Sequence, residues 1–301
     1  MSGYFSLTEN SGRVSGMGSV EDPFLVSDLD TFRWAIHQSC ECVKLCADLD
    51  CSELEYWTGV TVNASVVDLN GHTIKNINIT PVTADGNFFM NTPLSKMTIC
   101  NGVIQSISGT SVDYLFSGTL HGYGAVGTLY FKNLQISGTI TAYNSNGIFD
   151  NYDSYPGYMN FDKVSLNIAV QNTVSCSVFR PSSTTKHDNC NYHMNVTIGA
   201  SDGIGGTFTN SKLTGSVQLV STSSNSLFNS LASSVIACNI TPGDEKTLYP
   251  CAKSCTAVTI IDKNLISGAY DTPAKVKYLT TEQMKDADYL TNVAEFPVYE
   301  V

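Results

Sequence analysis

A pair of apolar residues returns along this sequence at intervals of about thirty residues. Four variable residues separate the two apolar positions of a pair, and one pair fits with a residue fewer. The second position advances from residue 74 to 104, 136, 166 and 198. The pairs are Leu69 and Ile74, Ile99 and Ile104, Phe131 and Ile136, Phe161 and Leu166, Met194 and Ile198 (the shorter one), Phe208 and Leu213, and Val235 and Ile240. This period indicates one structural unit that is repeated and stacked.

A second series, of phenylalanines, runs beside the first. Each phenylalanine lies in a short segment flanked by Gly, Asn or Ser, and most spacings are near 30, although the last is 20. The series consists of Phe89, Phe116, Phe149, Phe179, Phe208 and Phe228. Two independent series with a similar period strengthen the prediction of a repeat.

The residues between these positions predict strands. Short β-branched runs separated by Gly, Asn and Ser dominate from about residue 58 to 265, where amphipathic helical periodicity is nearly absent. A thirty-residue unit of short strands cannot close its own core, so it buries its apolar residues against the next unit. We therefore predict an all-β parallel β-helix of roughly six to eight coils, about 30–40 Å long at ~4.8 Å per coil. After residue 198 the repeat becomes irregular and does not fix the register.

Asparagines recur near the predicted strand turns. Asn70, Asn101, Asn133 and Asn210 follow the first apolar position of a coil at similar offsets. Asparagine tolerates left-handed backbone conformations, and its amide can stack on the amide of the next coil. We predict a partial asparagine ladder, with ordinary turn residues as the alternative.

Both ends of the chain contain candidate capping helices. Residues 27–38 place Leu29, Phe32 and Ile36 on one helical face, and Ser27 with Asp30 resembles a capping box. A second box, Thr280 with Gln283, precedes Met284, Ala287 and Leu290. Short helices there would cover the open edges of the stack. We accordingly divide the chain into an N-terminal arm, capping helix and first coil (1–57), the β-helix (58–265) and a C-terminal cap (266–301).

Charge and hydropathy exclude several classes of partner. Only 14% of the residues are charged, and the net charge is −11, which argues against a broad basic face for nucleic acid or an anionic membrane. No apolar run approaches the eighteen residues of a membrane span. The N-terminus has no basic region followed by an apolar one, so we expect no secretory signal. Synthesis in a cytosol would keep the ten cysteines as free thiols, with Cys100 and Cys238 in place of small hydrophobic residues.

Metal and cofactor motifs are weak. The spacings within Cys40, Cys42, Cys46 and Cys51 match no familiar zinc site, and the run from His187 through Cys190 to His193 offers three donors in an expected polar loop. Residues 122–127 match GxGxxG, but a strand is predicted directly after them where a dinucleotide site needs a helix. We expect no metal and no cofactor.

Catalytic groups are equally sparse. A polysaccharide-cleaving β-helix needs paired acid and base groups, or a cation with a basic residue, on one face. The candidate groups are Asp150, Asp153, Asp162 and Asp188 as carboxylates, and Arg180, Lys186 and His187 as bases. No Asp pair lies at two-residue spacing on one predicted strand, so we expect these groups to solvate loops and the protein not to be an enzyme.

A tyrosine-rich segment is the strongest candidate binding surface. Residues 143–158 hold several aromatic rings that suit contacts with sugars or proteins. The candidate binding residues are Tyr143, Asp150, Tyr152, Tyr155 and Tyr158. The alternative is an ordinary turn with partly buried tyrosines.

Several stretches resemble right-handed parallel β-helix proteins of the pectate-lyase-like superfamily, including phage spike and fibre proteins and bacterial surface proteins. Residues 18–36 (GSVEDPFLVSDLDTFRWAI) resemble their opening segment, residues 43–50 and 66–74 their first coils, residues 129–138 (LYFKNLQISG) later coils, and residues 279–290 their closing segment. The resemblance implies fold more than activity, because the superfamily includes lyases, hydrolases, adhesins and phage spikes.

From these features we expect a non-enzymatic structural or attachment protein of a bacteriophage virion, such as a head fibre, decoration protein or tail spike or fibre component. The resemblance implies a homotrimer, and the expected partners are other virion proteins and a host-surface glycan. One alternative is a carbohydrate-active depolymerase, a polysaccharide lyase or hydrolase on the same scaffold, with a groove between subunits. Another is a bacterial surface or injection-machine adhesin.

Overall fold

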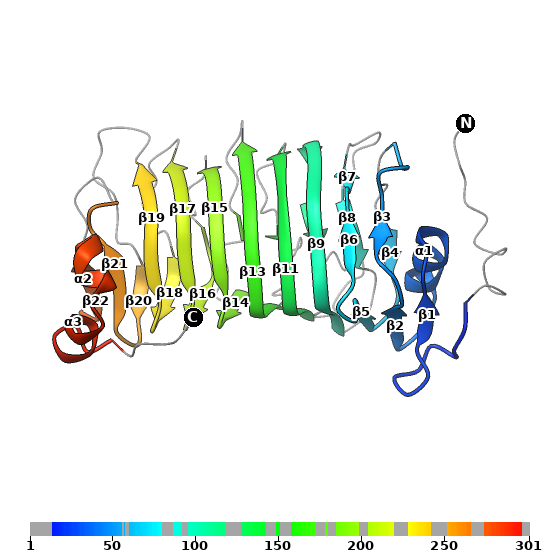
Figure 1. Ribbon diagram of the computed structural model, residues 1–301, viewed down its shortest axis with the longest axis horizontal. Coiled ribbons are helices and arrows are strands. Elements are labelled where there is room, and N and C mark those ends of the chain that lie inside the picture. The colour runs from blue at the N-terminus through cyan, green and yellow to red at the C-terminus, as the bar shows by residue number, and fades with distance from the viewer. Residues whose placement is uncertain are drawn as a thin grey trace.

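The protein folds as a parallel β-helix closed by short helices at both ends (Figure 1). The computed structural model describes residues 14–55, 57, 60–79, 87–91, 96–112, 114–117, 128–142, 149–150, 158–172, 178–179, 185–198, 204–219, 228–241, 252–265 and 274–296. Strand pairing within an 18-stranded sheet and a 4-stranded sheet is parallel throughout. The predicted all-β parallel solenoid is confirmed.

Three faces make up the coils. Face one contains β1 (Phe24–Val26), β2 (Cys42–Leu45), β5 (Val66–Asp68), β14 (Thr185–Asp188), β16 (Thr207–Thr209), β18 (Phe228–Ala232) and β20 (Ala252–Cys255). Face two contains β3 (Leu49–Asp50), β6 (Thr73–Lys75), β7 (Asn78–Ile79), β15 (Asn191–Ile198), β17 (Lys212–Leu219), β19 (Val235–Thr241), β21 (Thr259–Asp262) and β22 (Val276–Leu279). The long strands β9 (Lys96–Val112), β11 (Thr128–Ala142) and β13 (Tyr158–Asn172) bend from face one onto face two. The third face is the smaller sheet of β4 (Val60–Val62), β8 (Asn87–Asn91), β10 (Tyr114–Ser117) and β12 (Phe149–Asp150).

One column of residues on face two marks every coil. Consecutive members of the column pair directly with one another in the parallel register. They are Leu49, Ile74, Ile104, Ile136, Leu166, Tyr192, Leu213, Ile236, Ile261 and Tyr278. The coil length is therefore 30–32 residues between Ile74 and Leu166 and falls to 21–26 between Leu166 and Ile261. Ten levels at ~4.8 Å give a rod of about 43 Å, longer than predicted because the late coils are shorter.

This register corrects several of the predicted pairs. Tyr192, not Ile198, continues the face-two column, because Tyr192 pairs with Leu166 and Leu213. Likewise Ile236, not Ile240, is the next member of the column. On face one, Val67 rather than Leu69 lies beside Ile99. Tyr192 was missed because it is not aliphatic, whereas Ile236 and Val67 were missed because another apolar residue nearby fitted the four-residue spacing.

The phenylalanine series is a third-face column only in part. Phe89, Phe116 and Phe149 pair in register, and Phe149 forms a bridge with Phe179. Phe208 departs from the series, because it pairs with His187 on face one. That column on face one consists of Val43, Val67, Ile99, Phe131, Phe161, His187, Phe208 and Leu231.

The corner between faces one and two is a column of left-handed residues. Asn70, Asn101, Asn133 and Asn210 all have φ between 48° and 60°, as predicted. The column also includes Lys163, Asn189 and Ser233. The Nδ2 of Asn133 donates to the Oδ1 of Asn101 at 3.1 Å, so the partial asparagine ladder is confirmed. Lys163 interrupts it between Asn133 and Asn189.

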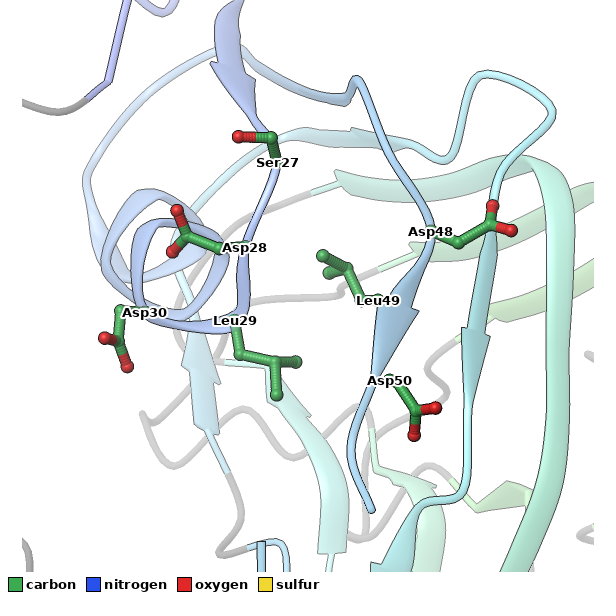
Figure 2. A pocket seen from close by; sticks show the side chains of 7 residues that line it. All are labelled: Ser27, Asp28, Leu29, Asp30, Asp48, Leu49 and Asp50. Atoms are coloured by element: carbon green, nitrogen blue, oxygen red, sulfur yellow. The ribbon is translucent and has the colours of Figure 1, made fainter. Parts of the chain in front are cut away.

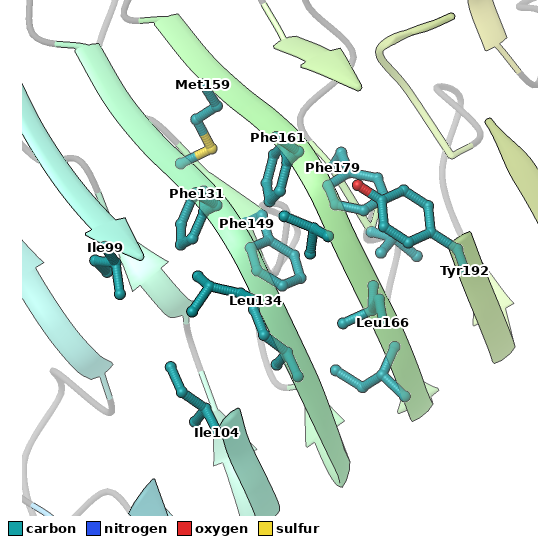
Figure 3. Close-up of a cluster of buried hydrophobic side chains, with 14 of the residues drawn as sticks. Ile99, Ile104, Phe131, Leu134, Phe149, Met159, Phe161, Leu166, Phe179 and Tyr192 are labelled. Carbon is teal, nitrogen blue, oxygen red and sulfur yellow. The ribbon is translucent and has the colours of Figure 1, made fainter. Parts of the chain in front are cut away.

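Aromatic rings stack along the middle of the core (Figure 3). The rings of Phe131 and Phe161 lie 4.6 Å apart at 7° to each other. Phe149 meets both edge-on and stacks on Phe179 at 5.2 Å. The middle coils thus place their rings against those of the previous coil, in the stacked and edge-to-face geometries that aromatic pairs prefer.

Buried hydroxyl groups replace aliphatic residues at the corner of the later coils. Ser211, Ser234 and Thr259 are buried and occupy the corner position held by Leu134 and Val164 in earlier coils. The Oγ of Ser211 accepts from the Cys190 amide at 3.1 Å, and the Oγ of Ser234 accepts from the Ser211 amide at 3.2 Å. Each serine also donates to the carbonyl two residues before it. This column satisfies the polar backbone inside a tight corner.

The two ends are covered by helices, as predicted. Helix α1 (Leu29–His37) buries Phe32 and Ile36 over the first coil. Its N-cap is Asp28, whose carboxylate accepts from the Thr31 amide at 2.9 Å, so the predicted Ser27–Asp30 box is wrong by one residue. The Thr280–Gln283 capping box is confirmed and begins α2 (Thr281–Lys285), which α3 (Ala287–Asn292) follows.

The sheet runs through both predicted domain boundaries. Strands β1 and β2 before residue 57 pair onward to β5, and β22 after residue 265 pairs with β21. No helix among the described residues has the length and apolar composition to cross a membrane.

Candidate functional site: a neutral face on the shaft

The predicted tyrosine-rich surface is described only at its edges. Tyr158 begins β13 and is 40% exposed. The backbone of Asp150 lies in β12. Tyr143, Tyr152 and Tyr155 lie outside the described residues. Binding through this segment therefore stays a prediction.

The predicted catalytic groups separate into two environments. Asp162 and Asp188 are register neighbours on the outer side of β13 and β14, and Lys186 is exposed beside Asn160. Asp153 and Arg180 lie outside the described residues. His187 was expected in a polar loop but is fully buried in β14, so it does not solvate a loop.

His187 is part of the core aromatic stack. Its ring lies 4.8 Å from the ring of Phe161 and 4.1 Å from that of Phe208, nearly parallel to both. Its Nδ1 is 2.9 Å from the Tyr192 hydroxyl, while Nε2 has no hydrogen-bond partner. A Cβ on Gly206 would come within 2.5 Å of Nε2, so only glycine fits there. Burial lowers the pKa of His187 to about 3, and the neutral ring serves the core as a small aromatic.

The predicted metal-donor runs do not converge. His193 is exposed on the outer side of β15, away from buried His187 and Cys190. No group of three His, Cys, Asp or Glu residues that could hold a metal ion is found in the described part of the chain. The described cysteines are free thiols. Burial raises the pKa of Cys40 to about 11 and of Cys51 to about 12.

Cys238 fills a core position as predicted, with its side chain fully buried. The prediction for Cys100 is wrong, because it is half-buried on the outer side of face one, next to Asp68 and Lys132.

A shallow pocket of about 350 Å³ lies at the N-terminal end, between the start of α1 and β3 (Figure 2). Four aspartates line it: Asp28, Asp30, Asp48 and Asp50. A hydrogen bond from the backbone N–H of Thr73 holds the pKa of Asp48 below its usual value. A hydrogen bond from the side-chain Nδ2 of Asn76 does the same for Asp50. Asp28 caps α1, and Asp48 and Asp50 tie neighbouring coils, so the oxygens of these three carboxylates already have structural roles.

From β9 to β19, the described outer residues of face two form a broad polar surface without carboxylates, which we call the neutral face. Figure 1 shows its strands side by side along the rod. It consists of Val103, Gln105 and Ser108 of β9; Gln135, Ser137, Thr139 and Thr141 of β11; Ser165, Asn167 and Ala169 of β13; Asn191, His193, Asn195 and Thr197 of β15; Lys212, Thr214, Ser216 and Gln218 of β17; and Val235, Ala237, Asn239 and Thr241 of β19. All are exposed or half-buried, and Lys212 is the single Lys or Arg of this set.

Hydrogen bonds between coils order part of the neutral face. The Nδ1 of His193 lies 3.1 Å from the Thr214 hydroxyl. The Ser216 hydroxyl donates to the Oδ1 of Asn195 at 2.9 Å. Amide and hydroxyl groups therefore stand in rows with partly fixed rotamers, which lowers the entropy lost when a partner binds.

The charge of the whole chain is segregated in the same way. Residues 1–68 contain eleven Asp and Glu against three Lys and Arg, a net charge of −8. Residues 69–240 contain seven of each and are neutral, and residues 241–301 contain nine against six, a net charge of −3. The sequence alone contains this distribution of charge, but the net charge of the whole chain does not reveal it.

No protein-family model matches this chain, and no curated protein matches its sequence. A solved structure from Bacteroides ovatus, provisionally described as an immunoglobulin A1 protease, is similar over 89% of this chain and 87% of that chain. The sequence identity is 13% and the TM-score 0.41. A similarity at that level carries no conclusion about this chain.

Proposed function

We propose that the protein is a non-enzymatic structural or attachment rod of a bacteriophage virion, in a head fibre, decoration protein or tail spike or fibre. The observation that carries this proposal is the continuous shaft of stacked coils, neutral in its middle and acidic at its ends. Stacked coils make a stiff spacer, because each coil is paired along its length with its neighbours. The resemblance of residues 18–36 and 129–138 to right-handed β-helix proteins of phage particles supports the same role.

The proposed partners are other virion proteins, further copies of the chain in a homotrimer, and a host-surface glycan. The exposed amides and hydroxyls of the neutral face are groups that hydrogen-bond another protein surface. The tyrosine-rich segment around Tyr158 would add aromatic contacts.

Particles purified from a culture that carries this sequence test the role. Antibodies against the chain should label a regular position on each particle in electron microscopy, and the chain should co-purify at a fixed ratio to the coat protein. A chain that is absent from the particles would overturn the proposal.

A reducing-sugar assay on capsular and cell-wall glycans tests the non-enzymatic part. We expect no release of sugar. Release that is abolished by Asp188→Ala would show instead a depolymerase that uses the exposed carboxylates of face one.

A further inference from the structure

We propose that the neutral face is a self-association surface, through which a second copy of this chain binds side by side with the first. This proposal stands on the strand register and the charge distribution, and it does not depend on the chain belonging to a virion.

The geometry of the face suits a flat partner. The outward residues of β13, β15, β17 and β19 lie in straight rows, because each residue pairs directly with its counterpart on the next coil. One row contains Asn167, His193, Thr214 and Ala237, and the next contains Ala169, Asn195, Ser216 and Asn239. Six strands at ~4.8 Å and about 25 Å of strand length give a surface of about 700 Å². A standard protein–protein interface buries about 800 Å² on each partner, so the face is close to the size that a stable pair needs.

Charge selects this face as the place where two copies of the chain can meet with the least repulsion. Two copies of a chain with a net charge of −11 repel each other unless they meet where carboxylates are missing. Face one carries charges of both signs on its outer side, Asp68, Asp162 and Asp188 beside Lys44, Lys132 and Lys186, which a contact there would have to desolvate. Both ends of the rod are acidic. The neutral face combines with itself without opposing carboxylates. Its amides and hydroxyls are both donors and acceptors, so they complement an identical surface.

The same distribution disfavours end-to-end growth. A β-helix has open strand edges at its ends, where another copy could add. Here the end segments carry net charges of −8 and −3, and the capping helices α1 and α2 lie over those ends. Copies are therefore directed to side-by-side contact in closed assemblies.

This arrangement predicts an unusual salt dependence. An interface held by ion pairs weakens as salt is added, whereas here the attraction comes from uncharged groups and the repulsion from the acidic ends. Raising the ionic strength from about 0.01 M to 0.15 M shortens the Debye length from about 30 Å to about 8 Å and screens that repulsion. Self-association should therefore strengthen with salt.

Sedimentation velocity of the full chain at about 1–50 µM, in low and in moderate salt, tests the proposal. The test variant is Asn195→Asp with Gln218→Glu, which places two carboxylates on the neutral face. The matched control is Asn160→Asp with Thr209→Glu, which places two on the outer side of face one. Far-UV circular dichroism and thermal melting establish that both variants fold.

We expect the native chain and the control to sediment as two or more protomers, more tightly in moderate salt, and the test variant to associate at least tenfold more weakly. A chain that is monomeric in every condition would overturn the proposal. So would equal weakening by the test variant and the control, or association that weakens with salt. If the test variant does not fold, Thr197→Arg with Thr241→Arg on the same face replaces it, with the same expected loss.

Discussion

The coils between Ile74 and Leu166 and those between Leu166 and Ile261 reach the same backbone geometry with different interiors. The long coils pack aliphatic residues and phenylalanines, and their corner interior is held by Leu134 and Val164. The buried polar side chains among the described residues after β1 and α1 lie in the short coils or directly after them: Thr185, His187, Ser211, Ser234, Thr259 and Asp262. The two groups of coils therefore satisfy the inside of the same corner differently, with aliphatic packing in the long coils and with hydroxyls bonded to the backbone in the short ones.

The largest expected loss of stability comes from a substitution in the aromatic stack, at the point where the long and short coils meet. The ring of Phe161 lies between those of Phe131, at 4.6 Å, and His187, at 4.8 Å. Phe161→Ala leaves a cavity with rings on both sides and should reduce the free energy of unfolding by about 3–5 kcal/mol. Urea denaturation followed by circular dichroism measures it. A loss below about 1 kcal/mol would contradict this packing.

Acid should destabilise the protein through His187, which is buried in the short coils. The pKa of His187 is about 3 in the folded protein and about 6.5 in the unfolded chain, so the unfolded state binds more protons as the pH falls below 6.5. Stability from this group is complete above pH 6.5, and about 2 kcal/mol of it is lost by pH 5. Urea midpoints at pH 7 and pH 5 measure the loss.

The control for this pH effect is His187→Phe, with His187→Leu if the larger ring does not fit beside Gly206. Either variant should lose most of the change between pH 7 and pH 5. Asp48 and Asp50, whose pKa values are lowered, stabilise the fold while they are ionised. They therefore add to the pH dependence only at lower pH, where they become protonated. An unchanged pH dependence in both variants would place His187 outside the core.

Removing one of the buried corner hydroxyls of Ser211, Ser234 and Thr259 in the short coils should cost less stability. Ser234→Ala removes the acceptor of the Ser211 amide and the donor to the Ala232 carbonyl. An unpaired buried N–H costs about 1–3 kcal/mol, and the unfolding free energy should fall by that amount. Exposed Ser165→Ala is the matched control and should stay within about 0.5 kcal/mol. Equal effects would show that the hydroxyl of Ser234 is not structural.

The smallest expected effect is an increase in stability from a substitution at the corner of the long coils. Lys163 adopts φ of 55° in the left-handed column, between Asn133 and Asn189. Lys163→Asn should raise the unfolding free energy by about 0.5–1 kcal/mol, because asparagine adopts this conformation more readily than lysine. Asn133→Ala should do the reverse and cost about 1–2 kcal/mol. Differential scanning calorimetry of both variants checks the two signs together.

The same contrast explains what sequence reasoning could predict. Sequence reasoning predicted the period of the long coils and the phenylalanine column through Phe179, because these positions hold residues that are nearly always buried. It also predicted the asparagine corner and the C-terminal capping box, because these residue types have a strong preference for such positions. The register of the short coils did not follow, because Tyr192 and His187 occupy positions where the template required an aliphatic residue or phenylalanine. The neutral face was missed because its signal is an absence of acidic residues in alternate strand positions, and becomes visible only once the strands are aligned.

A crystal or cryo-electron microscopy structure of the purified chain at side-chain resolution tests the central claim most directly. It should show parallel coils with the His187 ring enclosed between Phe161 and Phe208, and Tyr192 beside Leu166. Antiparallel pairing of these strands, or His187 facing solvent, would contradict the stacked-coil account and remove the aligned neutral face with it.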